Sequence, residues 1–381
     1  MPAPVVPRLP DLAAWLSRKS CFLLGPRQTG KSSLVRHALP RARVYDLLDS
    51  AVYLALSREP GRLARELTPR DKVVVLDEIQ RLPSLLDDAH HLTESRGIRF
   101  LMIGSSARRL QRGSAKLWGG RARMRSLHPL TARELGTHFD LTRAIQRGTL
   151  PAIYFADDPR AALDAYAGAY LREEIMDAGA VRNLPAFSRF LRAAALSNAT
   201  RVNFTSLASD AQVPRTTIYE YLAILQETQI LHEVPAWRAS VRRKPIASSK
   251  YYFFDVGVVS ALQGRLVKPG TPEFGAAVET WLLHELMAHR DYAGGGAVSH
   301  WRSTSGFDVN FVLGDHTAIA VTARHAVSPR DLRGLRALMD ERLLKRYLCV
   351  ALDPRRRQVD GITILPVAQF LDGLWEGEFV G

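Results

Sequence analysis

The chain is poor in the residues that mark disulfide-rich and zinc-binding proteins. Its 381 residues include two cysteines, Cys21 and Cys349, and neither has a cysteine or histidine neighbour at the spacing of zinc ligands. Each cysteine stands beside an apolar stretch typical of a strand, so we expect two buried thiols. The eleven histidines form no HExxH or HxxxH grouping, and we therefore expect no zinc.

Long apolar runs are also missing. No uninterrupted run approaches the length needed to cross a bilayer, and the N-terminal stretch MPAPVVPRLPDLAAWL lacks the ordered regions of a signal peptide. We expect no membrane contact and a cytoplasmic location. The length of the chain instead favours two or three domains, each with its own core.

Lysine is scarce, because only 8 of the 52 basic residues are lysine and 44 are arginine. The formal net charge is nevertheless +14, and a basic protein favours an acidic partner, most often nucleic acid. A coding bias toward arginine is the alternative explanation. Charge alone therefore does not decide whether the protein binds DNA.

The first motif with a specific chemistry is LLGPRQTGKSSLV, at residues 23–35. GPRQTGKS satisfies the Walker A pattern G-x-x-x-x-G-K-[ST], between a strand-like segment and one with helical spacing. The backbone N–H groups of such a loop bind phosphate, and we expect Lys31 to contact the β and γ phosphates and Ser32 to ligate Mg²⁺. The expected ATP-binding residues are Gly25, Pro26, Arg27, Gln28, Thr29, Gly30, Lys31, Ser32 and Ser33.

A second element supports a nucleotide site. The segment DKVVVLDEIQRL, residues 71–82, is typical of a central parallel strand that ends in Asp77 and Glu78. We expect Asp77 to hold Mg²⁺ and Glu78 to polarise the attacking water. The alternative is that both acids merely cap the following segment.

A third strand is expected in IRFLMIGSSARRL, residues 98–110, ending in Gly-Ser-Ser. Its Ser105 is placed to contact the γ-phosphate or the water, although Gly-Ser-Ser is also a common turn. An arginine-rich stretch follows, from which a neighbouring subunit of a homo-oligomer would supply transition-state charge. We favour Arg121 and Arg123, which follow two glycines, over the alternative of a solvated basic face.

Together these residues resemble a known family. GPRQTGKSSL, VVVLDEIQRLP, the Gly-Ser-Ser strand and GRARMRSLHPLTAREL, with its Glu134, are similar to the prokaryotic AAA-type ATP-binding proteins, whose ATPase core precedes a domain of unknown function. LPAIYF, YLREEI and KYYFFDVGVVSAL extend the resemblance over nearly the whole chain. It implies ATP binding and hydrolysis but no pathway. The family's sensor strand carries threonine where this chain has Ile103, so the sensor role passes to Ser105.

The middle of the chain, from about residue 184 to 255, predicts a winged helix. Two helical segments meet near Pro214, and a strand, a basic hairpin and a second strand follow. If the module binds DNA, its contacts are Arg215, Thr216, Thr217 and Tyr219 on the recognition helix and Arg238, Arg242, Arg243 and Lys244 on the wing. The alternative is a packing module, because the same helix carries Glu220 and Glu227.

The last third is similar to a restriction-endonuclease-like core without its chemistry. A helix carries Glu279 and Glu285, and a strand carries Asp308 and Asn310. Where such enzymes have Glu-x-Lys, this chain has Ala320-Val321-Thr322, whose neutral side chains cannot bind a divalent cation. We therefore expect no nuclease activity.

The predicted fold class is α/β: a P-loop NTPase parallel sheet, a helical winged-helix module and a small α/β nuclease-like domain. We expect domains at residues 1–150, 151–265 and 266–381. The leading functional hypothesis is a magnesium-dependent ATPase coupled to DNA or a protein partner. The alternative is a nucleotide-gated switch with little turnover; a P-loop kinase lacks a recognisable acceptor pocket.

Overall fold

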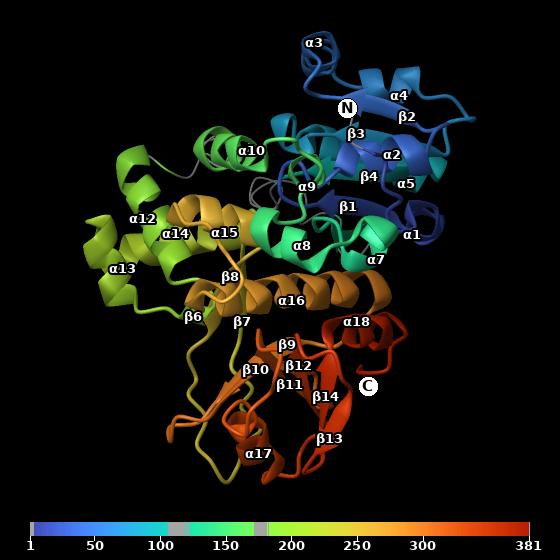
Figure 1. Cartoon of the computed structure of the whole chain (residues 1–381). Coiled ribbons are helices and arrows are strands. Elements are labelled where there is room, and N and C mark those ends of the chain that lie inside the picture. The colour runs from blue at the N-terminus through green and yellow to red at the C-terminus, as the bar shows by residue number, and fades with distance from the viewer. Residues whose placement is uncertain (1–3, 106–117, 119–121, 171–180, 182, 381) are drawn as a thin grey trace.

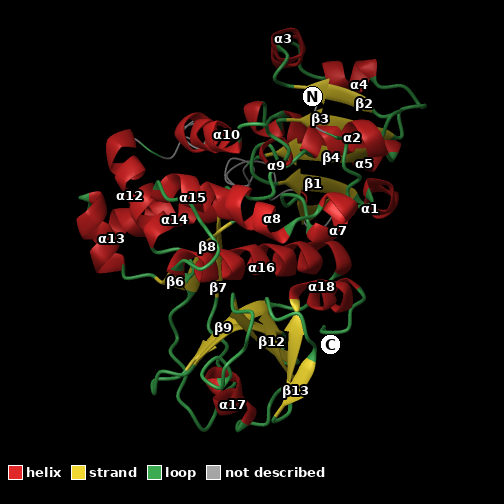
Figure 2. Cartoon of the chain, in the orientation of Figure 1, coloured by secondary structure: helices red, strands yellow, loops and turns green. Residues whose placement is uncertain are grey.

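The computed structural model describes residues 4–105, 118, 122–170, 181 and 183–380 (Figure 1). The protein is α/β, with a parallel sheet in its N-terminal part and further helical and sheet regions after it (Figure 2). The N-terminal elements are α1 (Leu12–Arg18), β1 (Ser20–Leu24), α2 (Lys31–Ala38), β2 (Arg43–Asp46), α3 (Ser50–Arg58), α4 (Arg62–Glu66), β3 (Val73–Asp77), η1 (Ile79–Arg81), α5 (Leu85–Arg96), β4 (Arg99–Gly104) and β5 (Ala122–Ser126).

The N-terminal sheet has the strand order β2-β3-β4-β1-β5, and every pair is parallel. Its central strands are continuous apolar runs because helices cover both faces. Alternate residues of each strand enter different apolar clusters: Phe22 and Leu24 lie on one face, and Cys21 and Leu23 on the other. All carboxyl ends of these strands therefore meet at one edge of the sheet.

A helical region follows the sheet. Its elements are α7 (Ala132–Leu135), η3 (Gly136–His138), α8 (Leu141–Arg147), α9 (Pro151–Tyr154), α10 (Pro159–Ala165), η4 (Tyr166–Tyr170), α12 (Leu184–Leu196), β6 (Thr200–Arg201), α13 (Phe204–Ala211), α14 (Arg215–Glu227), β7 (Leu231–Val234), β8 (Lys250–Phe253) and α15 (Val256–Gln263). The helices expected around Pro214 are present, and Pro214 itself is the N-cap of α14. β6, β8 and β7 form a small antiparallel sheet in that order.

The C-terminal part is built around a six-stranded mixed sheet of order β13-β14-β12-β11-β10-β9. Its elements are α16 (Pro272–Ala293), β9 (Val298–Arg302), β10 (Asp308–Leu313), β11 (Thr317–Thr322), α17 (Arg333–Met339), β12 (Arg346–Ala351), β13 (Arg357–Val359), β14 (Ile362–Pro366) and α18 (Val367–Trp375). Period-two alternation divides each strand between two cores: Ile319 packs in the cluster of α16 and α18, and Ala318 and Ala320 in the cluster of α17.

The long helix α16 crosses the middle of the molecule, with the C-terminal sheet on one side and α7 and α8 on the other (Figure 1). Leu130, Leu135 and Tyr154 belong to the same apolar cluster as α16. Residues near 130–154 thus follow the N-terminal sheet in sequence but pack against the C-terminal part. This packing brings α16 close to the edge where the parallel strands end.

The basic hairpin expected after β7 differs from the prediction. β7 and β8 do pair, but residues 235–249 between them extend along the C-terminal sheet toward α17 (Figure 1). Trp237 N donates to His300 O over 2.6 Å, and Ile246 N donates to Arg302 O over 2.8 Å. Sequence patterning could not show this, because the contacts join segments more than fifty residues apart.

Both cysteines are buried thiols, as expected. Burial raises the pKa of Cys21, and burial raises the pKa of Cys349 to about 12, so both are unreactive at neutral pH. Among the described residues, no helix has the length and apolarity required to cross a membrane.

Candidate functional site

The loop between β1 and α2 carries the Walker A residues, at the carboxyl edge of the parallel sheet. The loop closes on itself, since Thr29 Oγ1 donates to Pro26 O over 3.0 Å. Gly30, with φ of 94°, is the N-cap of α2, and Lys31, Ser32 and Ser33 form its first turn. The first N–H groups of a helix have no partner within the helix, so this end of α2 favours an anion.

Lys31 is held inside the loop. Its ammonium donates to Gly25 O over 2.7 Å and to Pro26 O over 3.0 Å, and the residue is 7% exposed. These two carbonyls aim the cation along the concave side of the loop. The ammonium can exchange them for phosphate oxygens without leaving the site.

The strand order brings Asp77 to the same loop. β4 lies between β1 and β3, and Asp77 is the last residue of β3. Ser32 Oγ donates to Asp77 Oδ2 over 2.9 Å. Burial raises the pKa of Asp77, and the hydrogen bond from Ser32 opposes that rise. A hydroxyl and a buried carboxylate side by side are hard oxygen ligands of the kind that Mg²⁺ prefers, so these residues fit the ion.

Glu78 follows Asp77 in a left-handed backbone conformation with φ of 57°. Its carboxylate accepts a hydrogen bond from Gln80 Nε2. Burial raises the pKa of Glu78, and the Lys31 ammonium opposes this effect. A carboxylate with a raised pKa is a better proton acceptor, which is the property that a general base requires.

The other residues predicted for this edge of the sheet differ in how close they lie to the loop. Ser105 is 3% exposed and directly follows β4, which lies between β1 and β3. Ile103 is buried in an apolar cluster. Arg123 is exposed on the edge strand β5, three residues before the end that lies beside the loop. Arg121 lies outside the described residues.

Comparison with known families finds a match over the N-terminal part of the chain. Residues 17–136 match the model of an AAA domain. The N-terminal part of this chain is an AAA-type P-loop domain. The loop between β1 and α2 and the acidic end of β3 lie within the matched residues. Residues 138–267 match a domain of unknown function, DUF8612, which directly follows the AAA domain.

Two curated relatives align with almost the whole chain. They are the uncharacterized proteins Rv2008c of Mycobacterium tuberculosis and Mb2031c of Mycobacterium bovis, each 25% identical over 95% of this chain and 88% of the relative. Two solved structures are also similar. DnaA bound to AMPPCP and single-stranded DNA is 12% identical, with a TM-score of 0.28, over 59% of this chain and 91% of its own. A STAND protein from Pyrococcus horikoshii is 14% identical, with a TM-score of 0.23, over 77% and 48%.

The expected DNA contacts separate into two places. Arg215, Thr216 and Thr217 form the outer face of the first turn of α14, where Arg215 Nη2 donates to the exposed Tyr219 hydroxyl over 3.0 Å. Arg242 and Arg243 instead contact the end of α17, and Lys244 follows them in the chain. Arg243 donates to Ala337 O and pairs with Asp340 over 2.9 Å, so its charge serves a contact within the protein.

Two acids of the C-terminal part, Glu279 and Asp308, both pair with Lys250. Lys250 Nζ lies 3.4 Å from Glu279 Oε1 and 3.4 Å from Asp308 Oδ2, and its side chain is 7% exposed. Asn310 Oδ1 accepts from Val321 N over 2.9 Å. The ammonium lies between the two carboxylates and joins β8 to α16 and β10.

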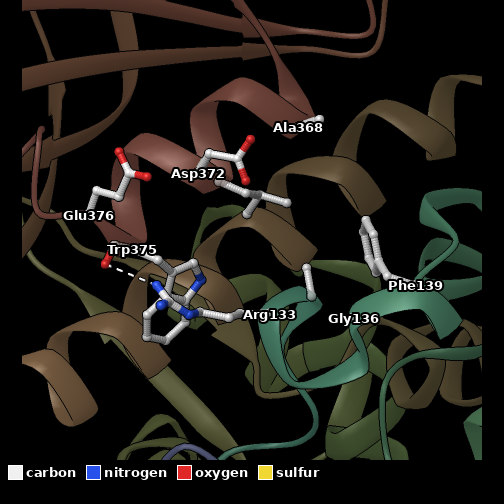
Figure 3. A pocket seen from close by; sticks show the side chains of 9 residues that line it. Arg133, Gly136, Phe139, Ala368, Asp372, Trp375 and Glu376 are labelled. Carbon is white, nitrogen blue, oxygen red and sulfur yellow. Dashed lines mark hydrogen bonds between the residues drawn. The ribbon is translucent and has the colours of Figure 1, made fainter.

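Gln80 and the residues of one cavity were not predicted from the sequence. Gln80, which holds Glu78, carries no motif signal beyond its place after the acids. A cavity of about 440 Å³ lies between α7 and α18, where Arg133 donates to Trp375 O over 3.1 Å and Asp372 and Glu376 lie on the α18 side (Figure 3). Its lining joins residues more than two hundred positions apart, which no local pattern reveals.

Proposed function

We propose that this protein is a magnesium-dependent ATPase whose turnover is coupled to DNA or to a protein partner. The observation that carries the proposal is the convergence of Lys31, Ser32, Asp77 and Glu78 on one edge of a parallel sheet. A structural strand end has no need of two neighbouring carboxylates, the buried Asp77 and the half-buried Glu78, beside such a loop.

Each residue has a distinct role in this proposal. Lys31 and the N–H groups at the start of α2 bind the phosphates, and Ser32 and Asp77 hold Mg²⁺. When bound, Mg²⁺ supplies positive charge to the β and γ phosphate oxygens. Glu78 accepts a proton from the attacking water, and Ser105 donates a hydrogen bond at the centre of the edge. Arg121 and Arg123 are the candidates for an arginine supplied by a neighbouring subunit.

The second candidate is a nucleotide-gated switch with little turnover. The contact between Glu78 and Gln80 favours it, because Glu78 must leave this amide before it can contact a water. In this case ATP binding changes the protein, and hydrolysis waits for a partner.

Coupling to DNA is proposed through the exposed first turn of α14, which we interpret as the recognition helix of a winged-helix module. Arg215 packs over Phe204 and Tyr219, with its guanidinium carbon 5.8 and 5.7 Å from the ring centres. The C-terminal sheet is interpreted as a nuclease-like fold without activity. The alternative is that both regions contact a protein partner.

Steady-state ATP hydrolysis by the purified protein and by its Glu78→Gln variant tests the proposal. We expect the variant to bind ATP as tightly as the wild type and to lose at least about a hundredfold in kcat, because the proton acceptor is removed. Duplex DNA is expected to raise the wild-type rate.

Three results would decide against this proposal. An unchanged rate in Glu78→Gln removes Glu78 from its role. Unchanged ATP affinity in Lys31→Ala, measured by calorimetry, contradicts the phosphate-loop assignment. ATP binding with no turnover, with or without DNA, favours the switch.

A further inference from the structure

Arg8, in the segment before α1, is buried beside the nucleotide loop. Its side chain is 6% exposed, and all three of its nitrogen donors are used. Nη1 donates to Thr29 O over 2.5 Å, Nη2 to His128 O over 2.7 Å, and Nε to Glu134 Oε1 over 2.9 Å. One guanidinium therefore joins the P-loop to His128 and Glu134, which lie 120 and 126 positions after Arg8 in the sequence.

The partners of Arg8 are themselves fixed. The Glu134 side chain is fully buried, and its two oxygens also accept from Leu9 N and Thr131 N, each over 2.9 Å. His128 N donates to the Tyr292 hydroxyl over 2.9 Å, and the His128 ring lies 2.7 Å from Asp291 Oδ2, both at the end of α16. A planar guanidinium that makes three hydrogen bonds is fixed in one orientation. A lysine ammonium in its place would not be fixed in this way.

The contact with Thr29 orients the next peptide. A trans peptide is planar, and its C=O and N–H point in opposite directions. Because Arg8 holds the Thr29 carbonyl on the outer side of the loop, the Gly30 N–H is directed to the opposite, concave side. A Cβ on Gly30 would lie 3.3 Å from Arg8 Nη1, so the guanidinium packs directly against this glycine.

We propose that Arg8 is a positioning residue for nucleotide binding, which holds the Thr29–Gly30 peptide with its N–H toward the phosphates. The inference rests on the proposed function, since it assigns a role within the same phosphate site. Arg8 contacts no nucleotide itself. It acts through the peptide, and it fixes that peptide to the end of α16.

The test measures the affinity of a non-hydrolysable ATP analogue with Mg²⁺ by calorimetry, for wild type and Arg8→Lys. The lysine keeps the ion pair with buried Glu134 but cannot reach all three acceptors. We expect about tenfold weaker binding, because a hydrogen bond to a charged phosphate is misdirected, with little change in Tm. Methylguanidinium added to Arg8→Ala is expected to restore part of the affinity, which a purely structural role would not predict.

The matched control is Arg133→Lys. Arg133 adjoins Glu134 in sequence, but its guanidinium packs over Trp375 at 5.9 Å in the cavity beside α18 (Figure 3). The Arg133→Lys variant should bind the ATP analogue as tightly as the wild type. If Arg8→Lys does not fold, the double variant Arg8→Met, Glu134→Gln removes both buried charges and serves instead.

The outcomes separate this inference from the proposed function. A folded Arg8 variant with wild-type affinity overturns the positioning role and leaves the proposed function in place. A wild-type protein that binds no analogue contradicts the proposed function, and the positioning role fails with it. Equal weakening by Arg133→Lys also overturns the inference.

Discussion

At the scale of single residues, Glu285 on α16 links the AAA domain to the C-terminal part. It is fully buried, and its Oε1 accepts from Ala132 N over 2.7 Å. Burial raises the pKa of Glu285 to about 8, and the neighbouring Glu134 adds to this rise. Between the ordinary value of 4.5 and about 8, the folded protein therefore retains a proton that the unfolded chain has released.

We predict that this proton makes wild-type stability fall as the pH rises. A single group of this kind lowers the free energy of unfolding by about 1.4 kcal/mol per pH unit within that window. Glu285→Gln keeps the oxygen that accepts from Ala132 and loses the titration. The free energy of unfolding of Glu285→Gln, minus that of the wild type, should therefore increase from pH 5 to pH 8. Urea denaturation at several pH values measures this difference.

The exposed Glu376, which is the C-cap of α18, gives the control for this measurement. Glu376→Gln should leave the pH dependence of the wild type unchanged. A constant difference between wild type and Glu285→Gln over the whole range would show that Glu285 is ionised in the folded protein.

At the scale of elements, the contact between α8 and α15 depends on a glycine. A Cβ on Gly257, in the first turn of α15, would lie 2.2 Å from Arg147 O and 2.7 Å from Gly148 N. Asp255, the N-cap of α15, also accepts from Thr149 N over 2.7 Å. The two helix ends therefore approach backbone to backbone.

We predict that Gly257→Ala lowers the free energy of unfolding by about 1–3 kcal/mol, because the methyl group forces these helix ends apart. Gly275 in α16 is the matched control, because its added Cβ meets nothing within 4 Å. Gly275→Ala should raise stability by up to about 1 kcal/mol through helix propensity. Thermal unfolding measures the stability of both variants. An equal change in stability in Gly257→Ala and Gly275→Ala would contradict the close approach of α8 and α15.

At the scale of the whole molecule, the net charge of +14 favours an acidic partner, and two surfaces are candidates for contact with DNA. One is the first turn of α14, and the other is the segment beside α17, where Arg242 and Lys244 are exposed and Arg243 is paired with Asp340. If both surfaces contact one duplex, each loses phosphate contacts on mutation. If only α14 contacts the duplex, mutations in the second surface leave DNA affinity unchanged.

We predict that Arg215→Ala weakens duplex DNA binding and reduces the slope of log affinity against log salt by about 0.9, the value for one phosphate contact. Arg242→Gln with Lys244→Gln tests the second surface while leaving the Arg243 pair intact. Arg160→Ala is the control, because Arg160 already pairs with Asp164 over 3.0 Å. Gel-shift titrations at several salt concentrations give the slopes. Identical slopes in all variants would exclude both surfaces.

The sequence by itself determined several local elements of this protein. Spacing alone identified the loop at Gly25 to Ser32 and the strand that ends in Asp77, because phosphate binding and buried parallel strands impose short-range patterns. The helices around Pro214 and the strand at Asp308 followed from apolar periodicity in the same way.

Only the tertiary structure decided which distant residues meet. Arg8 reaches Thr29 and Glu134, 21 and 126 positions away, and Lys250 lies between Glu279 and Asp308. The segment predicted as a basic wing packs beside α17 for the same reason. A buried charge must find its partner in space, and that choice depends on how whole elements pack, which no local pattern encodes.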